Sequence, residues 1–187
     1  MKTPALENGL MVVVYQSSSS TLSYKDWEKF DNFIRHKNLG LIEQAHESRG
    51  LPKTNFKESY KRFSKALIGI GSSKGQDRSF HLETEFIVLT NPYSEDTSRG
   101  IEVLLLYQNK PRINAQIEVF QRSVSGEVLV FYLKTDALGK AVIDVLPGHD
   151  YLLDAVVLRI PEGSNDKKAG AVWESLWAAT TFSVPNK

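Results

Sequence analysis

The chain has 187 residues, 41% of them hydrophobic and 24% charged, which is enough for one sizeable hydrophobic core or two small ones. Lys and Arg total 23 against 22 Asp and Glu, and the resulting net charge of +1 argues against a general nucleic-acid binder. No cysteine is present, so disulfides, thiolate metal sites and cysteine nucleophiles are excluded.

The pattern of the first residues predicts neither a membrane anchor nor an export signal. The apolar stretch from Leu10 to Tyr15 has six residues, whereas a bilayer-spanning helix needs about 20. Pro4, Glu7 and Asn8 precede it, without an apolar core behind a basic end. We therefore expect no membrane span, and a cytoplasmic protein if the chain is complete as written.

The first third of the chain predicts one strand followed by helices. Met11 to Tyr15 is short and rich in β-branched residues, which predicts a buried strand. An N-cap at Ser23 and apolar residues at helical spacing then predict a helix that stops at Gly40, and a short second helix is predicted over 41–48.

A third helix is predicted after Asn55, because large apolar residues recur there at i, i+4, i+7 and i+11. These residues are Phe56, Tyr60, Phe63 and Leu67. We expect their side chains to be buried where this helix packs against the rest of the chain, and the pattern to end at Gly69 and Gly71.

Beyond residue 80 the hydrophobic period changes to 2, which predicts short strands separated by turns. The candidate strands are Leu82 to Leu89, Ile101 to Gln108, Gln116 to Arg122, Val128 to Thr135, Ala141 to Leu146, Tyr151 to Ile160 and Leu176 to Val184. Residues 161–172 are predicted to form a surface loop. No helical pattern intervenes between the strands, so the predicted fold is mainly β with a helical N-terminal segment (α+β): a strand and helices over 1–72, and an antiparallel Ig-like β-sandwich domain over 78–187.

Two groups of residues are candidates for chemistry. His81, Glu83 and Glu85 alternate along a predicted strand, so they can share a face and offer nickel, cobalt or zinc suitable donors; the alternative is a solvated polar face. His149 and Asp150 can form an acid–base pair or bind an ion, or can instead stabilise a turn. The common hydrolase and zinc-protease motifs are absent, and we expect no enzyme activity.

Three stretches of the predicted sandwich carry a family pattern. Asn109 to Val119 resembles the opening of prealbumin-like and carboxypeptidase-regulatory-like modules, with Asn109 where those modules usually have Gly. Thr135 to Gly139 matches their T-D-x-x-G turn, and Pro147 to Leu152 resembles their Pro-Gly-x-Tyr entry to the next strand. The resemblance implies an Ig-like or prealbumin-like sandwich.

The flanking motifs extend the resemblance over nearly the whole chain, to the bacterial family called domain of unknown function 4198. The motifs are Tyr60 to Leu67, Leu82-Glu83, Thr90 to Tyr93, Leu106-Tyr107, Val172 to Ala178 and Thr181-Phe182. Members of this family are often labelled as the periplasmic component of a cobalt or nickel transport system. The resemblance thus implies a periplasmic location, a transport or cell-envelope partner, and bound nickel or cobalt.

The chain also departs from this family, whose members typically begin with a signal peptide and a further β segment. Residue 1 matches a point partway through the family pattern, so we expect a truncated member. The strand containing Val12 to Val14 would then lack a neighbour, and an unpaired edge favours a homo-oligomer.

Two functions remain open at this point. The first is a non-catalytic binding or accessory protein linked to cobalt or nickel uptake in the periplasm. The second is a structural or interaction module that binds a protein or a cell-envelope carbohydrate and no metal. Three or more converging His, Asp or Glu side chains would favour the first, and a broad exposed aromatic patch the second.

Overall fold

The computed structural model of the chain describes residues 8–162 and 170–186, so the predicted surface loop lies partly outside the described residues. The elements, in chain order, are β1 (Gly9–Gln16), β2 (Ser20–Tyr24), α1 (Trp27–His36), α2 (Ile42–Ser48), β3 (Phe56–Ile70), β4 (Thr84–Val88), β5 (Ile101–Tyr107), β6 (Lys110–Pro111), β7 (Gln116–Arg122), β8 (Val128–Lys134), β9 (Lys140–Ile143), β10 (His149–Arg159) and β11 (Trp173–Val184). No helix in these two ranges is long and apolar enough to cross a membrane.

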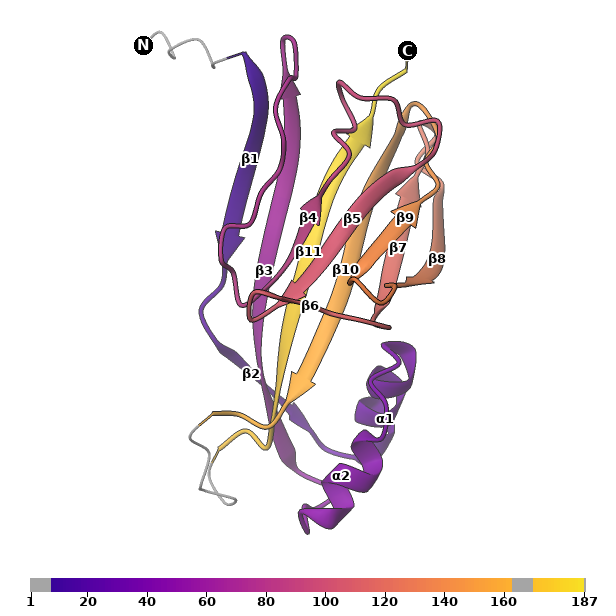
Figure 1. Ribbon diagram of the computed structural model, residues 1–187. Coiled ribbons are helices and arrows are strands. Elements are labelled where there is room, and N and C mark those ends of the chain that lie inside the picture. The colour runs from indigo at the N-terminus through magenta and orange to yellow at the C-terminus, as the bar shows by residue number, and fades with distance from the viewer. Residues whose placement is uncertain (1–7, 163–169, 187) are drawn as a thin grey trace, which may run out of the picture.

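The strands form two sheets that pack face to face as a sandwich, with both helices at one end of the larger sheet (Figure 1). The seven-stranded sheet has the order β1-β3-β11-β10-β7-β8, and β2 also pairs with β3. The four-stranded sheet has the order β4-β5-β6, with β9 paired to β5. The predicted fold class, a mainly β sandwich with a helical N-terminal segment, is confirmed.

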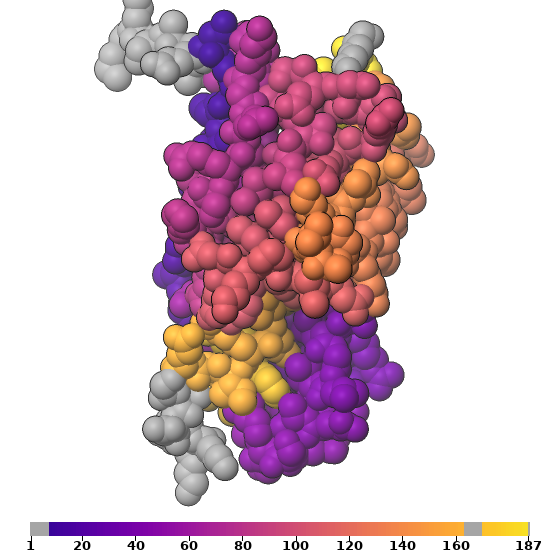
Figure 2. Space-filling model, viewed as in Figure 1, coloured from indigo at the N-terminus to yellow at the C-terminus, as the bar shows by residue number. Residues whose placement is uncertain are grey.

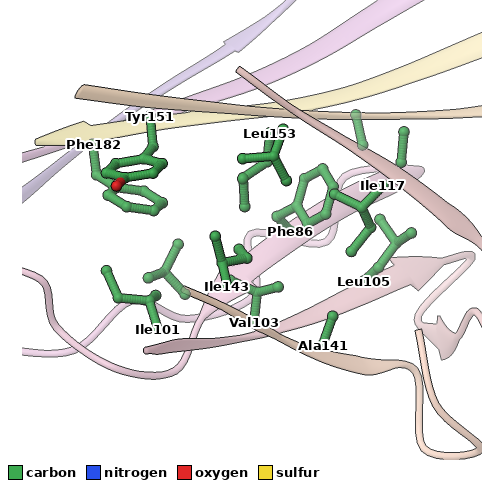
Figure 3. Packing of buried hydrophobic residues seen from close by; sticks show 14 of the residues in the cluster. Phe86, Ile101, Val103, Leu105, Ile117, Ala141, Ile143, Tyr151, Leu153 and Phe182 are labelled. Atoms are coloured by element: carbon green, nitrogen blue, oxygen red, sulfur yellow. The ribbon is translucent and has the colours of Figure 1, made fainter. Parts of the chain in front are cut away.

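The main hydrophobic core lies between the two sheets (Figure 3). Alternate residues of each strand point into it, as the period of 2 predicts. Tyr151 of β10 and Phe182 of β11 stack there with their ring centroids 5.5 Å apart. A second apolar cluster, between the helices and one end of the large sheet, contains Tyr24, Phe30, Ile34, Leu51, Phe56, Val172 and Trp173.

The third predicted helix is wrong, because this segment forms the long strand β3. Phe56 and Phe63 are seven residues apart, a spacing that puts two side chains on one side of a helix but on opposite faces of a strand. β3 is buried on both faces: Phe56 packs under the helices, whereas Phe63 and Leu67 lie on the side that faces the smaller sheet. Because one face of the strand is buried near Phe56 and the other near Phe63, the spacing of its apolar residues resembles that of a helix. Tyr60 of this set is only half-buried.

The expectation of an antiparallel sandwich needs a second correction, because β3 runs parallel to β11 from the Glu58–Trp173 pair to the Ala66–Thr181 pair. This parallel pair was not expected, because the residues that form β3 had been predicted to form a helix. The described strands after residue 78 pair antiparallel with one another, as expected. The division into domains at 1–72 and 78–187 stays a prediction, although the β3–β11 ladder crosses it.

β1 lies at one end of the larger sheet, where its neighbour among the described strands is β3. Val12 is partly buried against the main core, whereas Val13 is exposed on the opposite face. This is the edge position on which the expected self-association depends. Self-association itself stays a prediction.

Candidate functional site

The three predicted metal ligands lie near β4 but point to different partners. His81 precedes the strand with a φ of +59°, and its Nδ1 lies 3.1 Å from Oδ1 of Asn109. Glu83 forms an ion pair of 2.5 Å with Arg159. Glu85 is buried at 1% exposure. β4 begins at Thr84, so only Glu85 of the three residues lies in the strand. The alternation of a strand therefore does not place the three side chains on one face.

Glu85 belongs to a buried ionic cluster that joins β3 to β4. Nζ of Lys65 lies 2.7 Å from Oδ1 of Asp77 and 3.7 Å from Oε2 of Glu85. The hydroxyl of Ser79 donates a hydrogen bond of 2.5 Å to Glu85. Within residues 8–162 and 170–186, no group of three or more His, Asp or Glu side chains could hold a metal ion.

The second predicted pair, His149 and Asp150, likewise has separate partners. Nδ1 of His149 donates to the carbonyl oxygen of Pro147 at 2.9 Å, which supports the turn. Asp150 accepts hydrogen bonds from the hydroxyl of Ser183 at 2.5 Å and from Nη2 of Arg122 at 2.7 Å. These hydrogen bonds lower the pKa of Asp150, and the one from Ser183 has the largest effect.

Asp150 and Arg122 lie at one end of a hollow of about 810 Å³ on the outer face of the larger sheet. Tyr151 and Leu153 point into the core, so the alternating residues between and beside them point outward. The side chains that line the hollow from this face are Ala66, Ile68, Phe120, Arg122, Val128, Asp150, Leu152, Thr181 and Ser183. Its walls are therefore mainly apolar, and its polar groups gather where Arg122, Asp150 and Ser183 meet.

Tyr93 inserts beside this hollow where β3 and β11 stop pairing. The last paired residues of this ladder are Ala66 and Thr181. Beyond them, the hydroxyl of Tyr93 donates to the carbonyl of Leu67 at 2.6 Å and accepts from the backbone N–H of Ser183 at 3.1 Å. One side chain thus replaces the backbone hydrogen bonds that two diverging strands would otherwise lose. Burial raises the pKa of Tyr93, so the phenol stays protonated.

Gly69 leaves the room that the Tyr93 ring occupies. A Cβ atom at position 69 would lie 2.8 Å from Cγ of Tyr93 and 2.5 Å from Oγ of Ser73. Any larger residue would push against the ring that forms one wall of the hollow. The shape of the hollow therefore depends on a glycine that the sequence pattern had marked only as the end of a helix.

An ionic cluster lies on the same outer face, one row of side chains further along β7 and β10. Glu118 and Asp154 are directly opposite each other, and Lys37, just after α1, binds both carboxylates. Nε2 of His36 lies 2.9 Å from Oε1 of Glu118. The hydroxyl of Tyr132 donates to the same oxygen at 3.3 Å. This cluster attaches the end of α1 to the sheet.

Burial and charge act in opposition on these two carboxylates. Burial alone would raise the pKa of Glu118, but the hydrogen bond and the charge of Lys37 outweigh it, so this pKa is lowered. For Asp154 burial prevails, and its pKa is raised in spite of Lys37. Sequence reasoning missed Lys37 and Glu118 as partners. The available signal was an acidic residue between two apolar neighbours on each of two strands, Glu118 on β7 and Asp154 on β10.

The comparisons with known proteins assign the chain to a family but do not indicate an activity. Neither the curated proteins nor the solved structures contain a match to this chain. The family described as domain of unknown function 4198 matches over residues 1–159, which is most of the chain. On this evidence the chain belongs to the domain of unknown function 4198 family, as its sequence motifs had indicated.

Proposed function

We propose that this chain is a non-catalytic binding module that holds an uncharged, mainly apolar ligand with a polar end group in the hollow on the outer face of the larger sheet. The observation that carries this proposal is the hollow itself, with apolar walls that end at a charge-balanced pair of side chains. Its volume of about 810 Å³ falls within the range of about 300–1,000 Å³ that is usual for small-molecule sites.

The walls supply the affinity in this proposal. Ile68, Val128 and Leu152 each leave more than a third of their surface exposed on this face. Neighbouring exposed apolar side chains of this kind gain free energy when a ligand covers them. An apolar ligand body therefore fits against these three side chains, beside the polar end formed by Arg122 and Asp150.

The polar end selects against charged ligands. Arg122 and Asp150 form an ion pair of 2.7 Å, so their charges offset each other. A ligand with a net charge would meet one partner of the pair as a like charge. A hydroxyl or amide group, by contrast, can donate to Asp150 and accept from Arg122. We infer that the ligand carries a neutral polar end group.

A role in nickel or cobalt handling has less support from the described residues. His81, Glu83 and Glu85 are held by three different partners. An uptake role could act through a bound complex or a partner protein, and it remains the hypothesis that the family resemblance supplies. The second function considered from the sequence, a structural or interaction module that binds a protein or a cell-envelope carbohydrate and no metal, shares with this proposal only a binding role without a metal.

Titration with the uncharged fluorescent probe N-phenyl-1-naphthylamine tests the proposal. We expect saturable binding to the unmodified chain, and a loss of affinity of about tenfold or more in Leu152→Gln, because the wall loses an apolar contact. Val142→Gln is the matched control, since Val142 is an exposed β-branched residue on β9 of the other sheet.

Equal affinities of the two variants, or no binding to the unmodified chain, would contradict the proposal. A parallel calorimetric titration with nickel chloride separates the metal hypothesis from it. Tight nickel binding that His81→Ala abolishes would favour metal handling instead.

A further inference from the structure

Arg112 is a largely buried cation with no counter-ion in the described parts of the chain. Its Nη2 donates a hydrogen bond of 2.9 Å to the carbonyl oxygen of Val156. Its Nη1 is buried and finds no acceptor among the described residues. Burial lowers the pKa of this guanidinium to about 10, and no carboxylate opposes that effect. A buried charge is costly unless it is paired, so this arrangement calls for an explanation.

The other buried or half-buried arginines of the chain have partners that Arg112 lacks. Arg159 binds both Glu83 and Glu174. Arg49 also has a buried Nη1 without an acceptor, but its guanidinium lies 4.7 Å from the centre of the Trp173 ring. A cation–π contact of this kind compensates part of the cost of burial. Among the residues that the structure describes, Arg112 has neither compensation.

A hollow of about 350 Å³ opens beside Arg112. It is lined by residues 37–40, which connect the two helices, by 112–116 before and at the start of β7, by 156–158 of β10, and by Tyr107. Figure 2 shows the purple helical segment meeting the salmon and light-orange strands on this face of the molecule. This hollow is separate from the one on the outer face of the larger sheet, and the two share no lining residue.

The lining of this smaller hollow favours a single negative charge. It contains no Asp or Glu. Lys37 lines it too, but its ammonium is bound to Glu118 and Asp154, so Arg112 supplies the unbalanced charge. The amide side chains of Asn38 and Asn114 add hydrogen-bond donors.

The remaining lining is mainly apolar, and it also includes Gly40 and the polar side chains of Tyr107 and Gln116. The apolar residues are Leu39, Ile113, Ala115, Val156, Val157 and Leu158. One guanidinium among apolar walls suits a carboxylate on an apolar body better than a phosphate dianion, which would need more positive charge.

We propose that this hollow is a binding site for a small organic monocarboxylate with an apolar body, and that Arg112 is the residue that binds its carboxylate. Because Nη1 is closed off, the carboxylate approaches the guanidinium from the side of the hollow, where the delocalised charge is available to it. This inference goes beyond the proposed function, since it concerns another site and a ligand of opposite character.

Calorimetric titration at pH 7 with isovalerate and with its uncharged amide, isovaleramide, tests the site on the unmodified chain. We expect isovalerate to bind at least tenfold more tightly than isovaleramide, because the two probes share one body and differ in charge. Inorganic phosphate serves as a third probe. Binding of both isovalerate and the amide with equal affinity, or tighter binding of phosphate than of isovalerate, would overturn the proposal.

Two variants assign the effect to Arg112. In Arg112→Met we expect the preference for isovalerate over the amide to disappear. Arg112→Lys should keep a reduced preference, because it keeps the positive charge but places it on a shorter, differently shaped group. Arg35→Met is the matched control, since Arg35 is 73% exposed and pairs with Asp31 on α1. Loss of the preference in Arg35→Met, or its persistence in Arg112→Met, would contradict the assignment.

Discussion

Glu118 and Asp154 lie directly opposite each other on β7 and β10, and the ammonium of Lys37 binds both carboxylates. Two acidic side chains at adjacent positions of a sheet repel each other unless a cation lies between them. Lys37 comes just after α1, so the same contact that neutralises this pair also attaches the helix to the sheet. The helical segment is therefore held both by apolar packing and by a buried ion triad.

Lys37→Met tests the ion triad. Without Lys37, two nearly buried carboxylates lose their shared cation, although Glu118 keeps His36 and Tyr132 as partners. We expect the free energy of unfolding to fall by about 3–5 kcal/mol. Urea unfolding at pH 7, followed by circular dichroism, measures the change. Lys53→Met is the control, because Lys53 also binds two carboxylates, Glu43 and Glu47, but is 39% exposed. Similar losses in the two variants would argue that burial is not what makes the Lys37 contact strong.

Glu58→Gln tests a carboxylate that is buried without a cation. Glu58 is 3% exposed and accepts hydrogen bonds from the hydroxyls of Tyr24 and Ser175. Burial raises the pKa of Glu58, in spite of these hydrogen bonds. The unfolded-state pKa of a Glu is about 4.3. Because the pKa of Glu58 is higher in the folded state, its contribution to the free energy of unfolding falls as the pH rises above 4.3.

We therefore expect Glu58→Gln to be more stable than the unmodified chain at pH 7, on the order of 1 kcal/mol, and the advantage to vanish below about pH 4. Urea midpoints at the two pH values measure this difference. Glu127→Gln, an exposed position at the turn before β8, serves as the control. An advantage that is the same at both pH values would show that the ionisation of Glu58 is not its source.

His46 is expected to make the helical end of the molecule sensitive to acid. Its ring is fully buried: Nδ1 accepts from Nε1–H of Trp173 at 3.0 Å, and Nε2–H donates to the carbonyl of Pro52 at 3.1 Å. The contact with Trp173 requires an unprotonated Nδ1 and therefore the neutral imidazole, and burial lowers the pKa of His46. Because the pKa of His46 is lower in the folded than in the unfolded state, where it is about 6.5, the neutral ring stabilises the fold at pH values above 6.5. This stabilisation is lost as the pH falls through the folded-state pKa.

We expect the difference in unfolding free energy between pH 7.5 and pH 5 to shrink in His46→Phe, which cannot titrate. The same measurement on His149→Phe, a partly exposed turn position, is the control. A pH dependence that is unchanged in His46→Phe but smaller in His149→Phe would contradict the role of His46.

Tyr93→Phe tests the bridge between β3 and β11. Removing the hydroxyl leaves the carbonyl of Leu67 and the N–H of Ser183 without this partner, and we expect a loss of about 1–3 kcal/mol in the free energy of unfolding. We also expect weaker binding of N-phenyl-1-naphthylamine, because Tyr93 forms a wall of the outer hollow. Tyr15→Phe is the control, since Tyr15 is 59% exposed on β1. Equal stability of the two variants would refute the bridging role.

Much of the fold could be predicted from local pattern. The strands after residue 100 show a hydrophobic period close to 2 over part of their length, because each has a core-facing side. Their predicted positions agree with β5, β7, β8, β9, β10 and β11 to within a few residues. Apolar spacing and Gly40 also predicted α1 and α2. The N-cap expected at Ser23 is wrong, because Ser23 lies in β2 and Asp26 precedes α1. β3 could not be predicted in the same way, because it is buried on one face near Phe56 and on the other near Phe63.

The candidate sites could be predicted much less well. The alternation of His81, Glu83 and Glu85 indicated a shared face, but each side chain is bound by a residue distant in the sequence. Arg112 had been noted only as part of a family motif. Its lack of a counter-ion is a property of what surrounds it in space, and no local pattern carries that information.

The sequence by itself determined the mainly β class, the positions of most strands and both helices, and membership of the domain of unknown function 4198 family. These follow from periodicity, turn residues and motifs, which act over a few neighbouring residues. The parallel pairing of β3 with β11, the outer hollow closed by Tyr93 and the unpaired charge of Arg112 were decided only by the tertiary structure. The physical reason is that burial and electrostatic pairing depend on residues that are distant in the chain and adjacent only after folding.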